Sequence, residues 1–98
     1  MSVFAVVYSY TDEHERREEI RPSHRAFLER LGEVNLCSGP FGPDEDAGAL
    51  LLLRATSKEK ALALTEDDPF RTHGLVSNVH VRQWLPSLGE LSATLATS

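Results

Sequence analysis

A histidine and an aspartate are the residues of this 98-residue chain that suit acid–base chemistry best. His24 stands two positions after Pro22, which is typical of the first position of a helix. At the third position of such a helix, the positive end of the helix dipole favours a neutral imidazole, which can act as a general base. The other interpretation is a partly buried histidine that only bonds a backbone carbonyl.

Asp68 directly precedes Pro69, and this pair is typical of the N-cap and first position of a short helical turn. Capping alone would explain the aspartate. A carboxylate that also contacts His24 would fix the tautomer of the imidazole and strengthen it as a base. The segments of both residues are expected on one side of the sheet, so we expect the two side chains in one cleft, within about 6 Å.

Further polar residues could contact a ligand. The Ser38 hydroxyl could donate a hydrogen bond, and Gly39 would let a ligand approach the backbone, although a turn-forming role is the favoured explanation of Ser38. Three residues of the last expected strand share one face and could line a pocket for an aromatic or carboxylate ligand, with the arginine as the anion contact. They are His80, Arg82 and Trp84. A polar dimer interface would explain them as well.

The sequence predicts neither a metal site nor a cofactor. Acidic and histidine residues near positions 12–14 and 44–46 lack a third ligand at a familiar spacing. The single cysteine, Cys37, cannot form an internal disulfide and is expected to be a small buried apolar residue. No glycine-rich phosphate loop and no GxSxG elbow occurs, so any chemistry is expected to be cofactor-independent.

The composition is typical of one small acidic domain. Hydrophobic residues make up 41% of the chain, and the net charge is -5. We expect a single domain over 1–98, with a core over 2–86 and a C-terminal tail over 87–98. Such a chain builds one core but no deep active site, so a sizeable pocket is expected to need a second subunit.

The charge pattern excludes several classes of partner. An acidic surface disfavours nucleic acid and anionic membranes, and the arginines over 15–21 alternate with Glu as in a solvated segment. No 18-residue apolar run and no signal-peptide pattern occurs, so we expect no membrane partner and a cytoplasmic location.

Six elements are expected to position these residues. They are strands over 2–10, 33–37, 47–54 and 75–85, and helices over 22–31 and 58–66. Residues 11–20 are expected to form a connection, and Gly32 to close the first helix. A capping box of Thr56 and Glu59 is expected to begin the second helix. Alternation along the last strand places Val76 on the face of His80.

The order of these elements predicts a ferredoxin-like α+β sandwich. Two helices cover only one face of a four-stranded sheet, yet the strands over 2–10 and 47–54 are apolar on both faces. The uncovered face must therefore be buried by something else, and a second copy of the sheet is the simplest partner. We expect a homodimer with the closed interior of a dimeric α+β barrel.

An ordered set of short motifs resembles the YCII-related (YciI-like) family over about residues 3–88. The motifs are Arg21-Pro22-Ser23-His24, Ser38-Gly39-Pro40, Ala61-Leu62-Ala63-Leu64, Asp68-Pro69-Phe70 and Gly74-Leu75. The resemblance implies a dimeric α+β barrel related to muconolactone isomerases, with an active site around His24 and Asp68 beside the loop of Ser38. Gln83 stands where the family often has proline, and the tail after Gly89 has no clear counterpart.

Two classes of function are compatible with these residues. The first is a small enzyme, an isomerase, lyase or dehydrochlorinase, that uses His24 and Asp68 on a small polar or aromatic molecule. The resemblance implies the dehydrochlorinase option, since some relatives act on hydroxylated, chlorinated aromatics. The second is a non-catalytic ligand-binding or pathway accessory protein. Replacing His24 by Asn separates them, because a catalyst would lose turnover and keep its affinity for the ligand.

Overall fold

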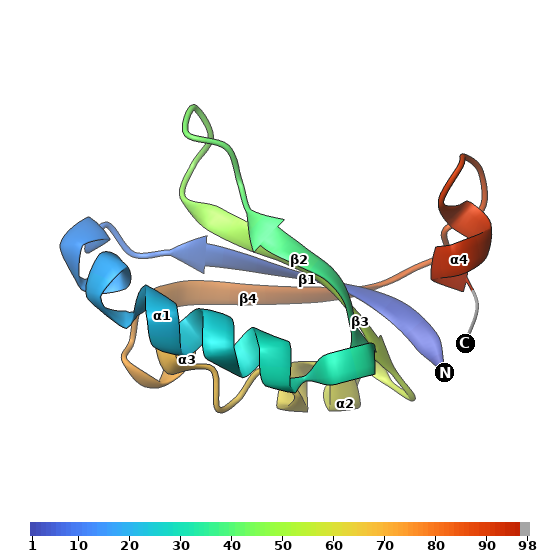
Figure 1. The fold of residues 1–98 in the computed structure, drawn as a ribbon, viewed down its shortest axis with the longest axis horizontal. Helices are drawn as coiled ribbons and strands as arrows, with labels where there is room; N and C mark the ends of the chain where they lie inside the picture. Colours follow the sequence, from blue (N-terminus) through green and yellow to red (C-terminus); the bar gives the residue numbers. More distant parts are fainter. Residues whose placement is uncertain (97–98) are drawn as a thin grey trace.

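A four-stranded antiparallel sheet forms the centre of the computed structural model, which describes residues 1–96 (Figure 1). Its strands are β1 (Ser2–Tyr10), β2 (Asn35–Pro40), β3 (Gly48–Ala55) and β4 (Val76–Trp84). The helices are α1 (His14–Arg30), α2 (Lys58–Ala63), α3 (Pro69–Thr72) and α4 (Ser92–Ala96), with a 3₁₀ turn over Gly32–Val34. The strand order β2-β3-β1-β4 confirms the predicted ferredoxin-like α+β fold.

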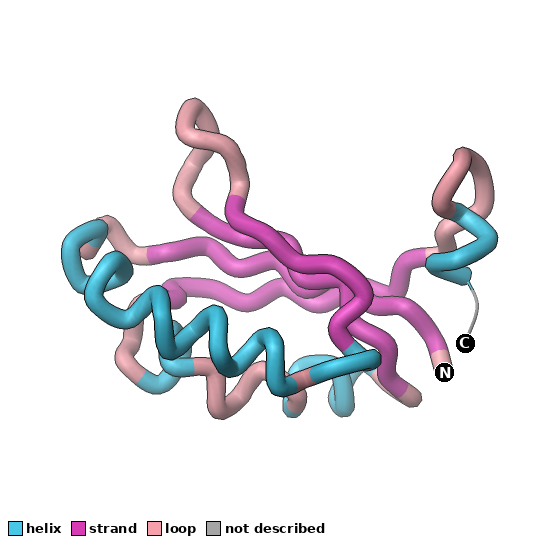
Figure 2. Tube along the Cα trace, in the orientation of Figure 1, coloured by secondary structure: helices cyan, strands magenta, loops and turns pink. Residues whose placement is uncertain are grey.

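The elements form two layers. Helices α1, α2 and α3 lie beneath one face of the sheet, and α4 lies beyond one end of it, near the N-terminus (Figure 2). In the described part of the chain, no helix is long and apolar enough to cross a membrane.

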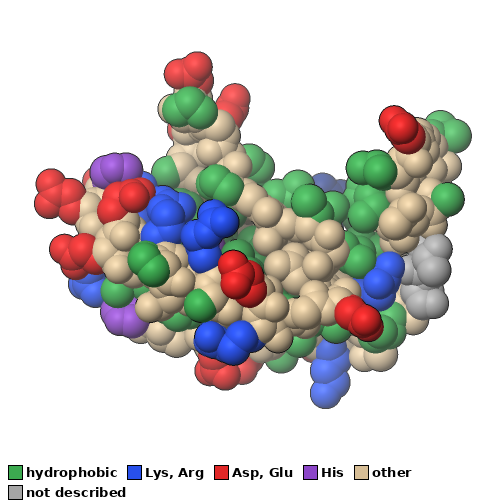
Figure 3. Space-filling view, in the orientation of Figure 1, with side chains coloured by type: hydrophobic (Ala, Val, Ile, Leu, Met, Phe, Trp, Pro, Cys, Tyr) green, Lys and Arg blue, Asp and Glu red, His purple; other side chains and the backbone are tan. Residues whose placement is uncertain are grey.

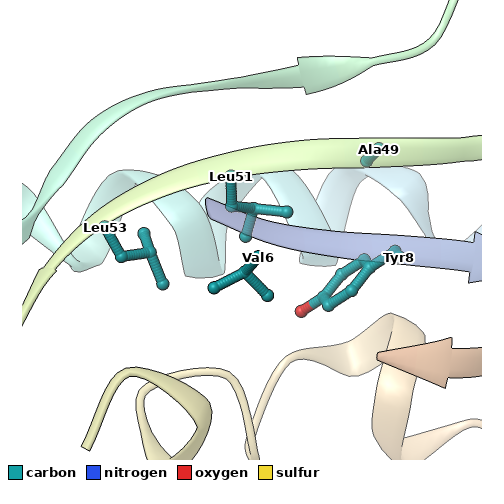
Figure 4. Close-up of a cluster of buried hydrophobic side chains, with 5 residues drawn as sticks. All are labelled: Val6, Tyr8, Ala49, Leu51 and Leu53. Atoms are coloured by element: carbon teal, nitrogen blue, oxygen red, sulfur yellow. The ribbon is translucent and has the colours of Figure 1, made fainter. Parts of the chain in front are cut away.

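The core lies between the sheet and these helices. Side chains alternate along a strand, so every second residue of β1 and β3 points toward the helical layer. Figure 4 shows the main cluster, which is Val6, Tyr8, Ala49, Leu51 and Leu53. Burial of a side chain such as Leu53 contributes about 1.5–3 kcal/mol to stability. A second cluster of Phe4, Ala55 and Ala61 continues the core beneath α2.

The opposite face of the sheet, here named the uncovered face, is apolar along its middle. Figure 2 shows no described helix over its centre. The face carries alternate residues of the two central strands, β1 and β3: Ala5, Val7, Leu50 and Leu52. All four side chains are only half-buried. Both central strands are therefore apolar on both faces, as their sequences predicted.

Helix α1 is longer than predicted. It begins at His14 rather than Pro22, so residues 14–20 are helical and Pro22 lies in the helix interior. An interior proline costs about 3 kcal/mol, and here burial along one face of the helix, by Arg17, His24 and Phe27, offsets that cost. His24 lies ten residues into the helix, so the prediction that the helix dipole acts on it is wrong.

Strand β2 also differs from the prediction. It begins at Asn35, after the 3₁₀ turn, and ends at Pro40, so Ser38 and Gly39 are strand residues and not a turn. Pro40 is tolerated there because β2 is an edge strand, where a missing N–H breaks no ladder bond. Cys37 is exposed, opposite Leu52 of the uncovered face, and the prediction of a buried cysteine is wrong.

The bounds of α2 and the position of Val76 also differ from the predictions. Ser57, and not Thr56, caps α2, because its hydroxyl accepts from the Lys60 N–H at 3.1 Å. The helix ends at Ala63 and not at residue 66. A register shift in the pairing of β1 with β4 brings Val76 opposite Tyr10, so Val76 packs against the core and not on the face of His80.

Candidate active site

Helices α1 and α3 bring His24 and Asp68 into direct contact. Nδ1 of His24 lies 2.8 Å from Oδ1 of Asp68, although the residues are 44 positions apart. Both side chains are buried, with 6% of His24 and 0% of Asp68 exposed. The predicted proximity is therefore confirmed, and it results from the docking of α3 against α1 beneath the sheet.

Asp68 accepts hydrogen bonds from two further groups. Its Oδ2 accepts from the Tyr8 hydroxyl at 2.7 Å, and its Oδ1 accepts from the Phe70 N–H at 3.0 Å. The second bond is the predicted cap of α3, so Asp68 is both a cap and the partner of His24. An ionised carboxylate only accepts, so Nδ1 of His24 carries the hydrogen and Nε2 is left as the basic nitrogen.

Tyr8 belongs to this network, and the sequence analysis missed it. Burial, and then the negative charge of Asp68, raise the pKa of the Tyr8 hydroxyl far above its usual value. The hydroxyl therefore remains a donor throughout the neutral range. The alternation of β1 places Tyr8 among its inward-facing residues. Alternation alone does not reveal that its hydroxyl bonds Asp68, which lies 60 positions away in the sequence.

Aromatic rings hold the imidazole from one side. The Phe70 ring stacks on His24 with centroids 3.9 Å apart and an interplanar angle of 7°. Tyr10 meets Phe70 edge to face at 5.4 Å, and the Arg17 guanidinium lies 5.0 Å above the Tyr10 ring. Arg17 also donates to the Thr11 carbonyl oxygen, so this arginine is a buried structural residue and not part of a solvated segment.

A pocket of about 180 Å³ opens beside His24, between α1 and the edge of the sheet formed by β2 and β3. Its apolar walls are Leu28, Pro40, Ala49 and Leu51. An engineered cavity of about 150 Å³ accommodates benzene, so this pocket has room for one ring with small substituents. The expectation that a sizeable pocket needs a second subunit stays a prediction.

Ser38 and Gly39 line the same pocket as His24. Asn35 Nδ2 donates to Ser38 Oγ at 3.1 Å and to the Leu28 carbonyl at 3.3 Å, which anchors β2 to α1. The predicted ligand residues of β4 lie elsewhere, along the edge of the uncovered face: His80, Arg82 and Trp84. Their role in ligand binding stays a prediction, and it would concern a different surface from the pocket of His24.

Two arginines at the pocket were also missed by the sequence analysis. Arg21 and Arg25 lie one turn apart on α1, on either side of His24, and both line the pocket. The spacing of the three residues was the available signal. A helix that begins at Pro22, as the sequence predicts, leaves Arg21 outside it, whereas α1 begins at His14.

Among residues 1–96, no three His, Cys, Asp or Glu side chains gather in a way that could hold a metal ion.

Comparison with known proteins shows the family to which this fold belongs. A model of the YCII-related domain matches residues 1–85, and the chain therefore belongs to the YCII-related domain family. The motif resemblance seen in the sequence is confirmed. No curated protein matches the chain.

Two solved structures are similar to this chain. One is the 5-chloro-2-hydroxyhydroquinone dehydrochlorinase TftG from Burkholderia phenoliruptrix AC1100, in complex with 2,5-dihydroxybenzoquinone, with a TM-score of 0.72 and 26% identity over 84% of this chain and 92% of TftG. The other is At3g17210 from Arabidopsis thaliana, with a TM-score of 0.49 and 20% identity over 93% of this chain and 100% of that protein. The likeness to TftG supports the predicted α+β fold.

Proposed function

We propose that this chain is a small acid–base enzyme that acts on a single-ring polar or aromatic molecule, by isomerisation or by elimination of the dehydrochlorinase type. The observation that carries the proposal is the buried His24–Asp68 pair beside a pocket of ring size. The similarity to TftG, a dehydrochlorinase solved with a hydroxylated quinone, supports this class of substrate and reaction.

In the proposed reaction, Nε2 of His24 removes a proton from a carbon or hydroxyl that a carbonyl or phenol of the substrate activates. In an elimination, the electron pair of the broken C–H or O–H bond forms a new double bond, and the C–Cl bond breaks so that chloride leaves with its electron pair. In an isomerisation, the imidazolium returns the proton to another atom of the substrate. Acid–base help of this kind contributes about 10²- to 10⁴-fold, which suits an activated substrate.

Asp68 supports the base without touching the substrate. Its carboxylate accepts from Nδ1 of His24, which holds the ring in one orientation and stabilises the imidazolium that forms. The hydrogen bonds from the Tyr8 hydroxyl and the Phe70 N–H fix the position of the Asp68 carboxylate.

We propose that the active form is a homodimer joined through the uncovered face, with no cofactor.

The experiment begins with a thermal-shift screen of the chain against hydroxylated aromatics, hydroxyquinones and small carboxylates. Turnover of each stabilising compound is then followed by absorbance, with chloride release for chlorinated hydroquinones. His24→Asn is expected to lower turnover at least 100-fold and to change ligand affinity less than threefold, because the base is lost while the pocket remains.

His73→Asn is the matched control. His73 is exposed and bonds only the carbonyl of its own turn and a neighbouring hydroxyl, so this variant should keep full turnover. Compounds that bind the wild-type chain without any turnover would contradict the proposal and favour a binding protein. An active His24→Asn variant would remove His24 from the mechanism.

A further inference from the structure

The rim of the pocket carries basic groups on an otherwise acidic molecule. The chain has a net charge of -5, yet the charged residues at the rim are two arginines, Arg21 and Arg25, and one acid, Glu29. Figure 3 shows basic side chains gathered over α1 on this face, with an acidic side chain next to them. The local excess of positive charge makes the pocket differ from the surface around it.

The two guanidinium groups differ in how free they are to bind a ligand. Arg25 is exposed and, within residues 1–96, makes no hydrogen bond or ion pair. Arg21 donates from Nε and Nη2 to Glu18 at 3.2 and 2.8 Å, and its guanidinium lies 5.8 Å from the Phe70 ring centroid. Both ionic partners are partly exposed, and surface pairs of this kind contribute little to stability. Arginine donates in a planar fork that matches the two oxygens of a carboxylate.

A third donor lies across the pocket from these arginines, on β2. Because Asn35 Nδ2 donates to Ser38 Oγ, the hydrogen of the Ser38 hydroxyl is left to bond another acceptor. Ser38 lines the pocket, so a ligand oxygen can take that hydrogen. The donors therefore come from both walls, α1 and β2, while Leu28 and Leu51 supply apolar surface for a ring.

We propose that this pocket selects a single ring that carries an ionised oxygen, either a carboxylate or an acidic enol or phenol. The ionised group binds Arg25 and Arg21, Ser38 donates to a ring oxygen, and the reacting edge of the ring meets Nε2 of His24. This inference rests on the proposed function only in its last step, since the recognition of the anion does not require turnover.

The test measures the binding of benzoate and benzamide, which have the same shape and differ in charge, by chemical-shift titration at pH 7. The acidic hydroxyquinone 2,5-dihydroxybenzoquinone is the second anionic probe. We expect both anions to bind at least tenfold more tightly than benzamide, and their affinity to fall as ionic strength rises.

Arg25→Gln should weaken the binding of both anions about tenfold and leave benzamide unchanged, while Arg25→Lys should restore part of the loss. Arg16→Gln is the control, because Arg16 is an exposed arginine of the same helix outside this pocket. Equal affinity for benzoate and benzamide, no binding of either anion, or unchanged binding by an Arg21→Gln, Arg25→Gln double variant would overturn the inference.

The proposed function can fail separately. Binding of anions that depends on Arg25, without turnover of any bound compound, would contradict the enzyme and support the anion site. Turnover of neutral and anionic substrates at equal efficiency, lost in His24→Asn but unaffected in Arg25→Gln, would support the enzyme and overturn the anion site.

Discussion

The carboxylate of Asp68 is fully enclosed, and three donors surround it: Tyr8, His24 and the Phe70 N–H. A buried charge costs several kcal/mol unless hydrogen bonds and partners compensate for it. Each donor therefore contributes to the stability of the fold as well as to the orientation of His24. At the scale of single residues, the site and the core cannot be separated.

Tyr8→Phe removes one of these donors and keeps the ring. We expect the free energy of unfolding to fall by about 1–3 kcal/mol, because Oδ2 of Asp68 loses its buried partner. Turnover should fall about tenfold as Asp68 becomes less fixed. Urea unfolding at pH 8 and steady-state kinetics measure the two effects.

Tyr10→Phe is the control for stability, since the Tyr10 hydroxyl has no hydrogen-bond partner within residues 1–96.

Alkaline pH gives a second check of the buried Tyr8 hydroxyl. The pKa of Tyr8 is raised in the fold, so above about pH 10 the unfolded tyrosine ionises while the folded one does not. The stability advantage of wild type over Tyr8→Phe should therefore shrink above pH 10. If the difference in free energy of unfolding between wild type and Tyr8→Phe stayed constant above pH 10, that result would contradict a buried Tyr8 hydroxyl.

At the scale of elements, local signals predicted α3 and its cap, while longer-range burial decided α1. Asp68 and Pro69 define the start of α3 from two adjacent residues, and the structure agrees. The start of α1 depends on the burial of Arg17 beside Tyr10, which no local pattern shows. The sequence therefore indicated His24 and Asp68 but missed Arg21 and Arg25, whose place at the pocket follows from the longer helix.

Asp68→Asn separates the cap of α3 from the charge beside His24. An asparagine oxygen can still accept from the Phe70 N–H, so the cap is kept, and stability should fall by less than about 2 kcal/mol. The negative charge that holds the Nδ1–H tautomer is lost, so turnover should fall at least 100-fold. Thermal unfolding and kinetics of the same sample measure both.

Asp68→Ala is the matched variant, since it removes both the cap and the charge. It should lose turnover to the same extent as Asp68→Asn and be clearly less stable. Turnover by Asp68→Asn close to the wild-type value would show that Asp68 is a cap only.

At the scale of the whole molecule, the uncovered face is an apolar surface that no described helix covers at its centre. Four half-buried apolar side chains of β1 and β3 line its middle, including Val7 and Leu50. Contiguous apolar surface of this kind is typical of an interface. The pattern of both strands predicted this face from the sequence, because no helix remained to cover it.

We expect the chain to sediment at micromolar concentration with about twice the mass of 10.9 kDa. Leu50→Lys places a charge in the middle of the uncovered face and should shift the protein to the monomer. Leu62→Lys is the control, because Leu62 is an exposed leucine of α2 on the helical side. A wild-type monomer, or a Leu50→Lys dimer of unchanged stability, would contradict an interface on this face.

The pocket of His24 lies on the helical side of the sheet and is lined by residues of α1, β1, β2 and β3. In a dimer joined through the uncovered faces, the sheet would lie between each pocket and the interface, so we expect no partner group in the pocket. Coupling between sites requires contacts that differ between two states of the assembly, and we expect no such contact to link the proposed interface to this pocket. Saturation would therefore be hyperbolic, without cooperativity, and a dimer with one inactive chain would work at half the rate of the intact pair.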